Sequence, residues 1–106
     1  MNQDILNKIR NFSKERDWDQ FHSGENLAKA LIIEAAELLE LYQWKQETEK
    51  VQELKEELAD VFLYAIMIAD CYGFEIDKII MEKLKKNEEK YPVKKAYGNS
   101  KKYNEY

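Results

Sequence analysis

The sequence has one histidine, one cysteine and one proline among its 106 residues. A single cysteine cannot form a disulfide within the chain, and Cys71 lies in an apolar helical segment, where we expect a reduced core residue. A single histidine, His22, excludes a di-iron carboxylate bundle, because that site needs a Glu-x-x-His motif on each of two helices. Three glycines, one proline and no strand-like alternation predict an all-α chain.

Long apolar runs and excess positive charge are also missing. No run of 18 apolar residues is present, and the first residues lack the basic and apolar regions of a signal peptide, so we expect a cytoplasmic protein without a membrane partner. The net charge of −4 disfavours nucleic acid as a partner. Residues 83–106 nevertheless contain eight lysines against three glutamates, a net of +5, which leaves −9 on the preceding residues. An acidic core beside a basic C-terminal segment suits a metal-bound polyphosphate.

Hydrophobic periodicity predicts four helices in a single domain that spans residues 1–106. The expected helices cover residues 3–16, with a stripe of Ile5, Ile9 and Phe12, and then 26–45, 49–72 and 76–90, with an aromatic loop at 17–24 and a basic tail at 93–106. Thr48 is the expected N-cap of the third helix, Gly73 its expected end, and Pro92 the stop of the fourth helix.

The apolar faces of the two central helices are longer than one small bundle buries. We therefore expect a homo-oligomer, either a dimer or a tetramer, in which the central helices of two chains form a four-helix-bundle core.

Two acidic pairs stand inside these apolar central helices. Glu34 and Glu37 lie three residues apart in the second helix, and Glu57 and Asp60 in the third, so each pair shares one helix face. Glu34 and Glu57 fall at positions where core side chains are expected. An unpaired carboxylate costs several kcal/mol to desolvate, so buried carboxylates are normally paired, protonated or metal-bound.

Cationic partners for these carboxylates are scarce in the sequence. Lys29 is the only basic residue in the segment 27–44, and the segment 56–77 contains none. Packed antiparallel, the central helices would gather four carboxylates, with Glu40 as a fifth in the second shell or as a ligand. Oxygen ligands favour Mg²⁺, with Mn²⁺ as a substitute. The alternative is a solvated acidic helix face, which is common in sequences rich in glutamate.

Four separated blocks of the sequence resemble, in the same order, the MazG-like all-α nucleoside triphosphate pyrophosphohydrolases, and their dCTP pyrophosphatase-like members in particular. The blocks are Arg16-Asp-Trp18-Asp-Gln-Phe21-His22, Glu34-Ala-Ala-Glu37-Leu-Leu-Glu40-Leu-Tyr-Gln-Trp44, Glu57-Leu-Ala-Asp60-Val-Phe-Leu-Tyr64 and Lys83-x-x-x-Asn87-x-x-x-Tyr91-Pro92.

The resemblance implies an enzyme that hydrolyses a (d)NTP to the monophosphate and pyrophosphate with Mg²⁺. It also implies that Glu34, Glu37, Glu57 and Asp60 are the catalytic metal ligands. The implied substrates are dCTP-like or modified pyrimidine nucleotides, removed in a house-cleaning role.

Aromatic residues near the acidic pairs are candidates for substrate binding. Trp18, His22 and Trp44 offer flat faces on which a nucleobase can stack, and Tyr64 follows Asp60 by one turn and can donate its hydroxyl to a phosphate. As plain alternatives, Trp44 caps the bundle end and Tyr64 is a core residue.

Two groups of residues near the C-terminus are candidates for phosphate binding. Lys83 and Asn87 lie one helical turn apart and share a face, although a surface lysine is the plain alternative. Lys101, Lys102 and Tyr103 in the basic tail form a candidate lid over the triphosphate, against the default of a frayed terminus.

Two other functions stay open at this point. One is a non-catalytic helical interaction or regulatory module that retains the bundle, since fold does not fix function. The other is a hydrolase that acts on a different phosphate bond of a nucleotide.

Overall fold

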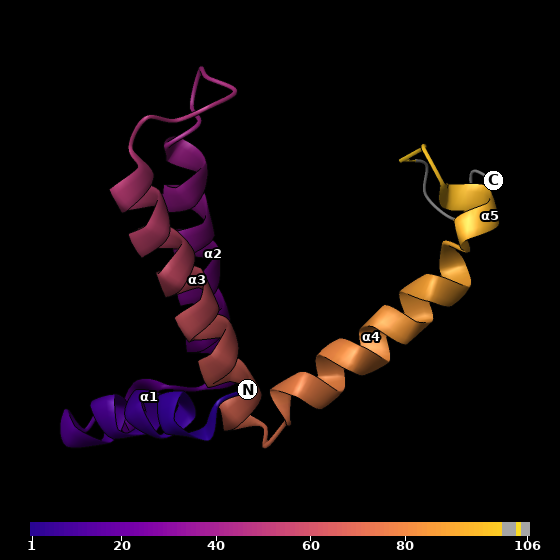
Figure 1. The fold of residues 1–106 in the computed structure, drawn as a ribbon. Helices are drawn as coiled ribbons and strands as arrows, with labels where there is room; N and C mark the ends of the chain where they lie inside the picture. The colour runs from indigo at the N-terminus through magenta and orange to yellow at the C-terminus, as the bar shows by residue number, and fades with distance from the viewer. Residues whose placement is uncertain (101–103, 105–106) are drawn as a thin grey trace. The chain divides into compact units, whose positions relative to one another are not determined.

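The structure of the protein is a computed structural model that describes residues 1–100 and 104. In this part of the chain all regular structure is helical, which confirms the all-α prediction (Figure 1). The chain divides into two compact units, Met1–Phe74 and the residues from Glu75 on, and each is described by itself. Within the described residues, no helix combines the length and the apolar character needed to cross a membrane. The elements are α1 (Gln3–Glu15), the short 3₁₀ helix η1 (Asp19–Phe21), α2 (Gly24–Glu40), α3 (Val51–Cys71), α4 (Ile76–Lys90) and α5 (Val93–Ala96).

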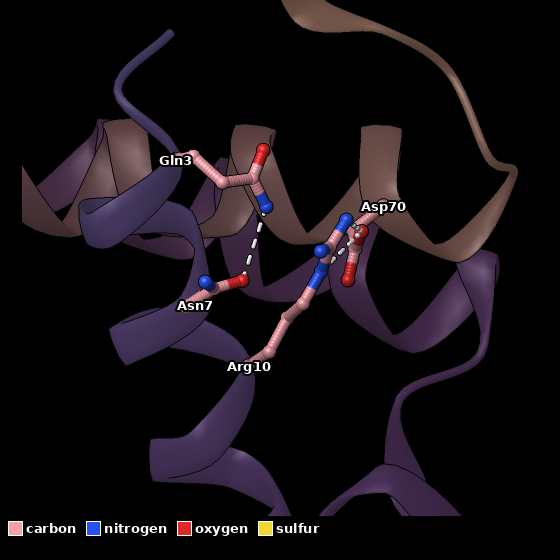
Figure 2. Close-up of polar contacts among 4 residues, drawn as sticks. All are labelled: Gln3, Asn7, Arg10 and Asp70. Atoms are coloured by element: carbon pink, nitrogen blue, oxygen red, sulfur yellow. Dashed lines mark hydrogen bonds and ion pairs between the residues drawn. The ribbon is translucent and has the colours of Figure 1, made fainter.

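The first unit is built on a hairpin of α2 and α3, which lie side by side along their length (Figure 1). Helix α1 is tied to the C-terminal end of α3 by an ion pair, in which Arg10 Nε and Nη2 both donate to Asp70 Oδ1, at 2.9 and 2.6 Å (Figure 2). This ion pair holds α1 beside α3.

Side chains cap the starts of the first two helices. Asn2 Oδ1 accepts from the amides of Asp4 and Ile5, and Ser23 Oγ accepts from the amide of Asn26 at 3.1 Å. The predicted cap of the third helix is wrong: Thr48 Oγ1 accepts from the amide of Lys50 at 3.1 Å in a turn, and α3 begins only at Val51. The hydroxyl thus forms a local turn, which competes with helix capping.

Helix α2 is shorter at its C-terminal end than predicted. It ends at Glu40, and the next residues form turns in which the amides of Tyr42 and Gln43 bond to carbonyls three residues back. Trp44 then takes a left-handed backbone with φ 71°, which no helix accommodates.

The end of α3 agrees with the prediction. Gly73 has φ 69°, its amide bonds to the Asp70 carbonyl at 3.1 Å, and the Phe74 amide bonds to the Ala69 carbonyl at 2.8 Å. These are the two hydrogen bonds of a Schellman cap, for which glycine is the favoured residue.

The second unit contains α4 and the four-residue α5. Helix α4 starts at Ile76 and ends at Lys90 ahead of Pro92, as predicted. Helix α5 was not predicted, because a helix of four residues is too short to show periodicity.

The core of the described chain is small. Leu27 and Ala69 are its buried apolar residues, whereas Cys71, expected in the core, is exposed at the last residue of α3. The Cys71 thiol donates to the His22 carbonyl at 3.6 Å. One chain by itself therefore covers little of its apolar surface.

Replacing Gly73 with alanine should lower the free energy of unfolding by about 1 kcal/mol, because the added Cβ disfavours a positive φ while open space surrounds the position. Urea denaturation measures the change. Gly73→Asn is the matched control and should cost less, since asparagine tolerates this conformation better. Equal losses in the two variants would contradict the backbone explanation.

Candidate functional site

Three carboxylates converge between α2 and α3. Glu34 and Glu37 extend from α2 and Glu57 from α3, and each offers one oxygen that lies within 4.8 Å of the other two. Glu34 and Glu57 are half-buried, and Glu37 is exposed. The predicted convergence of the acidic pairs is therefore present for these three residues.

Burial of the cluster perturbs its ionisation. Burial first, then a hydrogen bond with Glu37 and the charges of Glu37 and Asp60, together raise the pKa of Glu34 from its ordinary 4.5 to about 7. The pKa of Glu57 is also raised, first by burial and then by Glu37. The carboxylates thus crowd negative charge where water is partly excluded.

Asp60 and Glu40, the other two candidate acidic residues, lie outside this group of three. Asp60 is half-buried and lies outside the group of three, yet close enough for its charge to raise the pKa of Glu34 and Glu57. Glu40 is exposed at the end of α2 and does not belong to the group, so its role as ligand or second shell stays a prediction.

The cluster fits a divalent cation. Glu34 Oε2 and Glu57 Oε2 are buried, and no group in the described chain donates a hydrogen bond to them. Buried carboxylate oxygens without a donor are costly unless a cation or a proton satisfies them. A donor set made only of carboxylates suits a hard cation such as Mg²⁺.

A pocket of about 410 Å³ is lined in part by Asp60, the carboxylate whose charge acts on Glu34 and Glu57. It joins four residues singled out from the sequence, Trp18 and His22 from the segment after α1, and Asp60 and Tyr64 from α3. Its remaining lining is mostly apolar and comes from α1 and α3, namely Ile5, Lys8, Ile9, Phe12, Leu63 and Met67.

Trp44 lies apart from this pocket within the chain. It follows α2, is 92% exposed and is not among the lining residues. Its stacking role stays a prediction. The exposed indole could stack on one face of a base, but it does not form part of a pocket that would also contact the other face.

The remaining candidates lie toward the C-terminus. Lys83, exposed, and Asn87, half-buried, stand one turn apart on α4, in the second unit, and their phosphate-binding role stays a prediction. Lys101, Lys102 and Tyr103, the candidate lid, lie outside the described residues.

Sequence reasoning missed the contribution of α1 to the pocket. Ile5, Ile9 and Phe12 were predicted to form one apolar stripe of the first helix, without a functional role, and all three line the pocket. An apolar stripe that packs against another helix and one that lines a pocket have the same periodicity, so the sequence pattern does not distinguish the two roles. His22 also lines a second cavity of about 300 Å³, next to the Arg10–Asp70 ion pair.

Comparison with known proteins identifies the family of this chain. The model of a family described as MazG-like matches residues 29–106 of this chain. The chain belongs to the MazG-like family. This confirms the resemblance that was drawn from the four sequence blocks.

Two curated relatives of this MazG-like chain are dCTP pyrophosphatase 1 of Mus musculus, 36% identical over 110 residues, and dCTP pyrophosphatase 1 of Homo sapiens, 36% identical over 112 residues. The alignments cover 95% and 97% of this chain but 65% and 66% of the mouse and human proteins, so the chain spans about two thirds of their length. A solved pyrophosphatase from Archaeoglobus fulgidus is similar with a TM-score of 0.80 and 34% identity, covering 85% of this chain and 91% of that one.

The raised pKa of Glu34 predicts how the stability of the metal-free MazG-like chain depends on pH. Between pH 4.5 and about 7 the folded chain holds a proton that the unfolded chain has lost, so stability is lost as pH rises through this window. Thermal unfolding in EDTA should therefore show a falling midpoint, and Mg²⁺ should raise the midpoint more at pH 8 than at pH 5. Glu34→Gln, which cannot ionise, is the control; an unchanged pH slope in this variant would contradict the assignment.

Proposed function

We propose that this chain hydrolyses a nucleoside triphosphate to the monophosphate and pyrophosphate with Mg²⁺, and that dCTP or a 5-modified pyrimidine triphosphate is its substrate. One observation carries the proposal: Asp60, which lines the aromatic pocket, lies close enough to the carboxylate cluster for its charge to raise the pKa of Glu34. A nucleotide has a charged triphosphate at one end and a flat base at the other, and this pair of features matches both ends. The names of two similar proteins, dCTP pyrophosphatase 1 and the Archaeoglobus fulgidus pyrophosphatase, agree with a pyrophosphohydrolase reaction.

Glu34, Glu37 and Glu57 would hold the cation, with Asp60 at the edge toward the pocket. When bound, the cation supplies neutralisation of phosphate charge and a lower pKa for water. Water adds to one phosphorus of the α–β anhydride and the bridging P–O bond breaks. A carboxylate of the cluster orients that water and accepts its proton.

The pocket suits a base, because its walls are aromatic and apolar. Trp18 and His22 line it and have flat rings on which a base can stack, and Tyr64, one helical turn after Asp60, adds a hydroxyl group. Stacking binds every base, so preference for a pyrimidine depends on the volume of about 410 Å³ and on polar groups at its edge. Lys83 and Asn87 keep their proposed role as phosphate-binding residues.

The decisive assay is product analysis by ion-exchange chromatography. Each common and each 5-modified (d)NTP is incubated with the protein in Mg²⁺ and, separately, in EDTA. Monophosphate plus pyrophosphate, formed only with metal and mainly from one base, supports the proposal. Orthophosphate as product would indicate another phosphate bond, and no turnover by folded protein would favour an interaction module.

Glu37→Gln should lower kcat by about 100-fold, because it removes one charged ligand from the cluster while keeping side-chain size. Steady-state kinetics at saturating Mg²⁺ measures the loss. Glu53→Gln, on the exposed first turn of α3, is the matched control and should keep full activity. Turnover that survives in the Glu37 variant would count against the assignment.

We further propose that a second copy of the chain covers the outer faces of the hairpin. Ile32 and Leu39 of α2 are 67% and 69% exposed and lie two turns apart on one face. Leu58 and Phe62 of α3 are exposed one turn apart. Apolar stripes with this spacing on adjacent helices are typical of helix–helix packing, which agrees with a four-helix core.

Ile32→Glu should dissociate this assembly, because it places a charge in the apolar interface. Light scattering after size exclusion should give a multiple of 12.7 kDa for the parent chain and a lower mass for the variant. Gln52→Glu adds the same charge at an exposed position of α3 outside the stripe of Leu58 and Phe62, and should leave the mass unchanged. A monomeric mass for the parent chain would contradict the proposal.

A further inference from the structure

A tight turn directly after α1 sets the direction of Trp18. The amide of Asp17 bonds to the Lys14 carbonyl at 3.1 Å, and that of Trp18 bonds to the Ser13 carbonyl at 3.0 Å. Asp17 itself has φ 55°, a left-handed conformation that is strained for a residue with a Cβ. Gln20 Nε2 supports it by donating to the Asp17 carbonyl at 3.0 Å and to its carboxylate at 2.9 Å. The chain thereby folds Trp18 back toward α1.

The indole is not fixed by burial. Trp18 is 44% exposed, and its ring meets the ring of Phe12 edge-on, with centroids 5.7 Å apart and planes at 74°. This geometry is favourable for an aromatic pair. Because Phe12 is itself largely exposed, the pair needs another contact to hold one arrangement.

Arg16 supplies that contact. Its guanidinium carbon lies 3.8 Å from the centroid of the Phe12 ring, and its Nη1 donates to the Phe12 carbonyl at 3.0 Å. The guanidinium therefore holds both the ring and the backbone of the same residue. A carboxylate oxygen of Glu15 also lies 3.9 Å from Nη1, but this exposed pair is weak.

We propose that Arg16 is a positioning residue, which fixes Phe12 and through it the Trp18 wall of the base pocket. Phe12 and Trp18 line the pocket, whereas Arg16 does not. Arg16 therefore acts on substrate only through these rings. The inference rests on the proposed function, because it assigns the pocket to the base of the nucleotide.

The first test separates binding from chemistry. Arg16→Met keeps the length of the side chain and removes its charge, and should raise KM for dCTP about threefold while kcat stays within about twofold. Arg16→Lys keeps the charge and should restore most of the affinity. Lys14→Met, which removes a charge from the same turn of α1, is the control and should leave KM unchanged.

A double-mutant cycle tests the route through Phe12. Phe12→Leu should raise KM by itself, and adding Arg16→Met should have no further effect. Additive effects of the two changes would overturn the proposal, because Arg16 would then act independently of the ring.

Fluorescence tests the position of Trp18 without reference to activity. The chain has two tryptophans, so Trp44→Phe leaves Trp18 as the only one. In this background Arg16→Met should shift the emission to the red and increase quenching by acrylamide. Unchanged emission and quenching would overturn the proposal, and so would a fluorescence change without a rise in KM. Parent protein that turns over no nucleotide would instead overturn the proposed function, and fluorescence would still decide whether Arg16 orders Trp18.

Discussion

Two buried carboxylate oxygens, Glu34 Oε2 on α2 and Glu57 Oε2 on α3, set the constraint on which the first unit depends. Packing the two helices against each other removes these oxygens from water and raises the pKa of both groups. Apolar residues would pack here at no such cost, and replacing buried charges by apolar side chains is commonly neutral or stabilising. The hairpin therefore carries a destabilising feature, which a cation would convert into a stabilising one on our proposal.

On our proposal, α3 also positions the base of the nucleotide. Asp60 lies close enough to influence Glu34 and also lines the pocket, and Tyr64 and Met67 continue one face of α3 along that pocket. A helix rises by about 1.5 Å per residue and is stiff, so the spacing between cluster and pocket is fixed by α3 itself. A bound nucleotide would have to span this spacing, which limits where its phosphates can lie. Orientation of the substrate would follow from one element rather than from several loops.

Helix periodicity explains how much of this was predictable. A step of three residues places Glu34 beside Glu37 on any helix, and antiparallel pairing then brings Glu57 to them, so the cluster follows from sequence and topology. The pocket does not follow, because it depends on the left-handed turn at Asp17, where the sequence offers no glycine as a signal. Thr48 failed as a cap for a related reason: its hydroxyl has two local uses, and propensity does not choose between them.

Association of two chains would add apolar burial that the small core of one chain lacks, and this burial would offset the cost of the carboxylate cluster. Leu27 and Ala69 are the buried apolar residues of the described chain, while Ile32, Leu39 and Phe62 are exposed on the hairpin. Each fully buried aliphatic or aromatic side chain contributes about 1.5–3 kcal/mol, so covering a few of these residues would offset the cost of burying two carboxylates. The two requirements then support each other. The hairpin has apolar outer faces and an acidic inner face. On our proposal, a second chain would cover the apolar faces and a cation would neutralise the acidic face. Longer helices in a single chain would do neither.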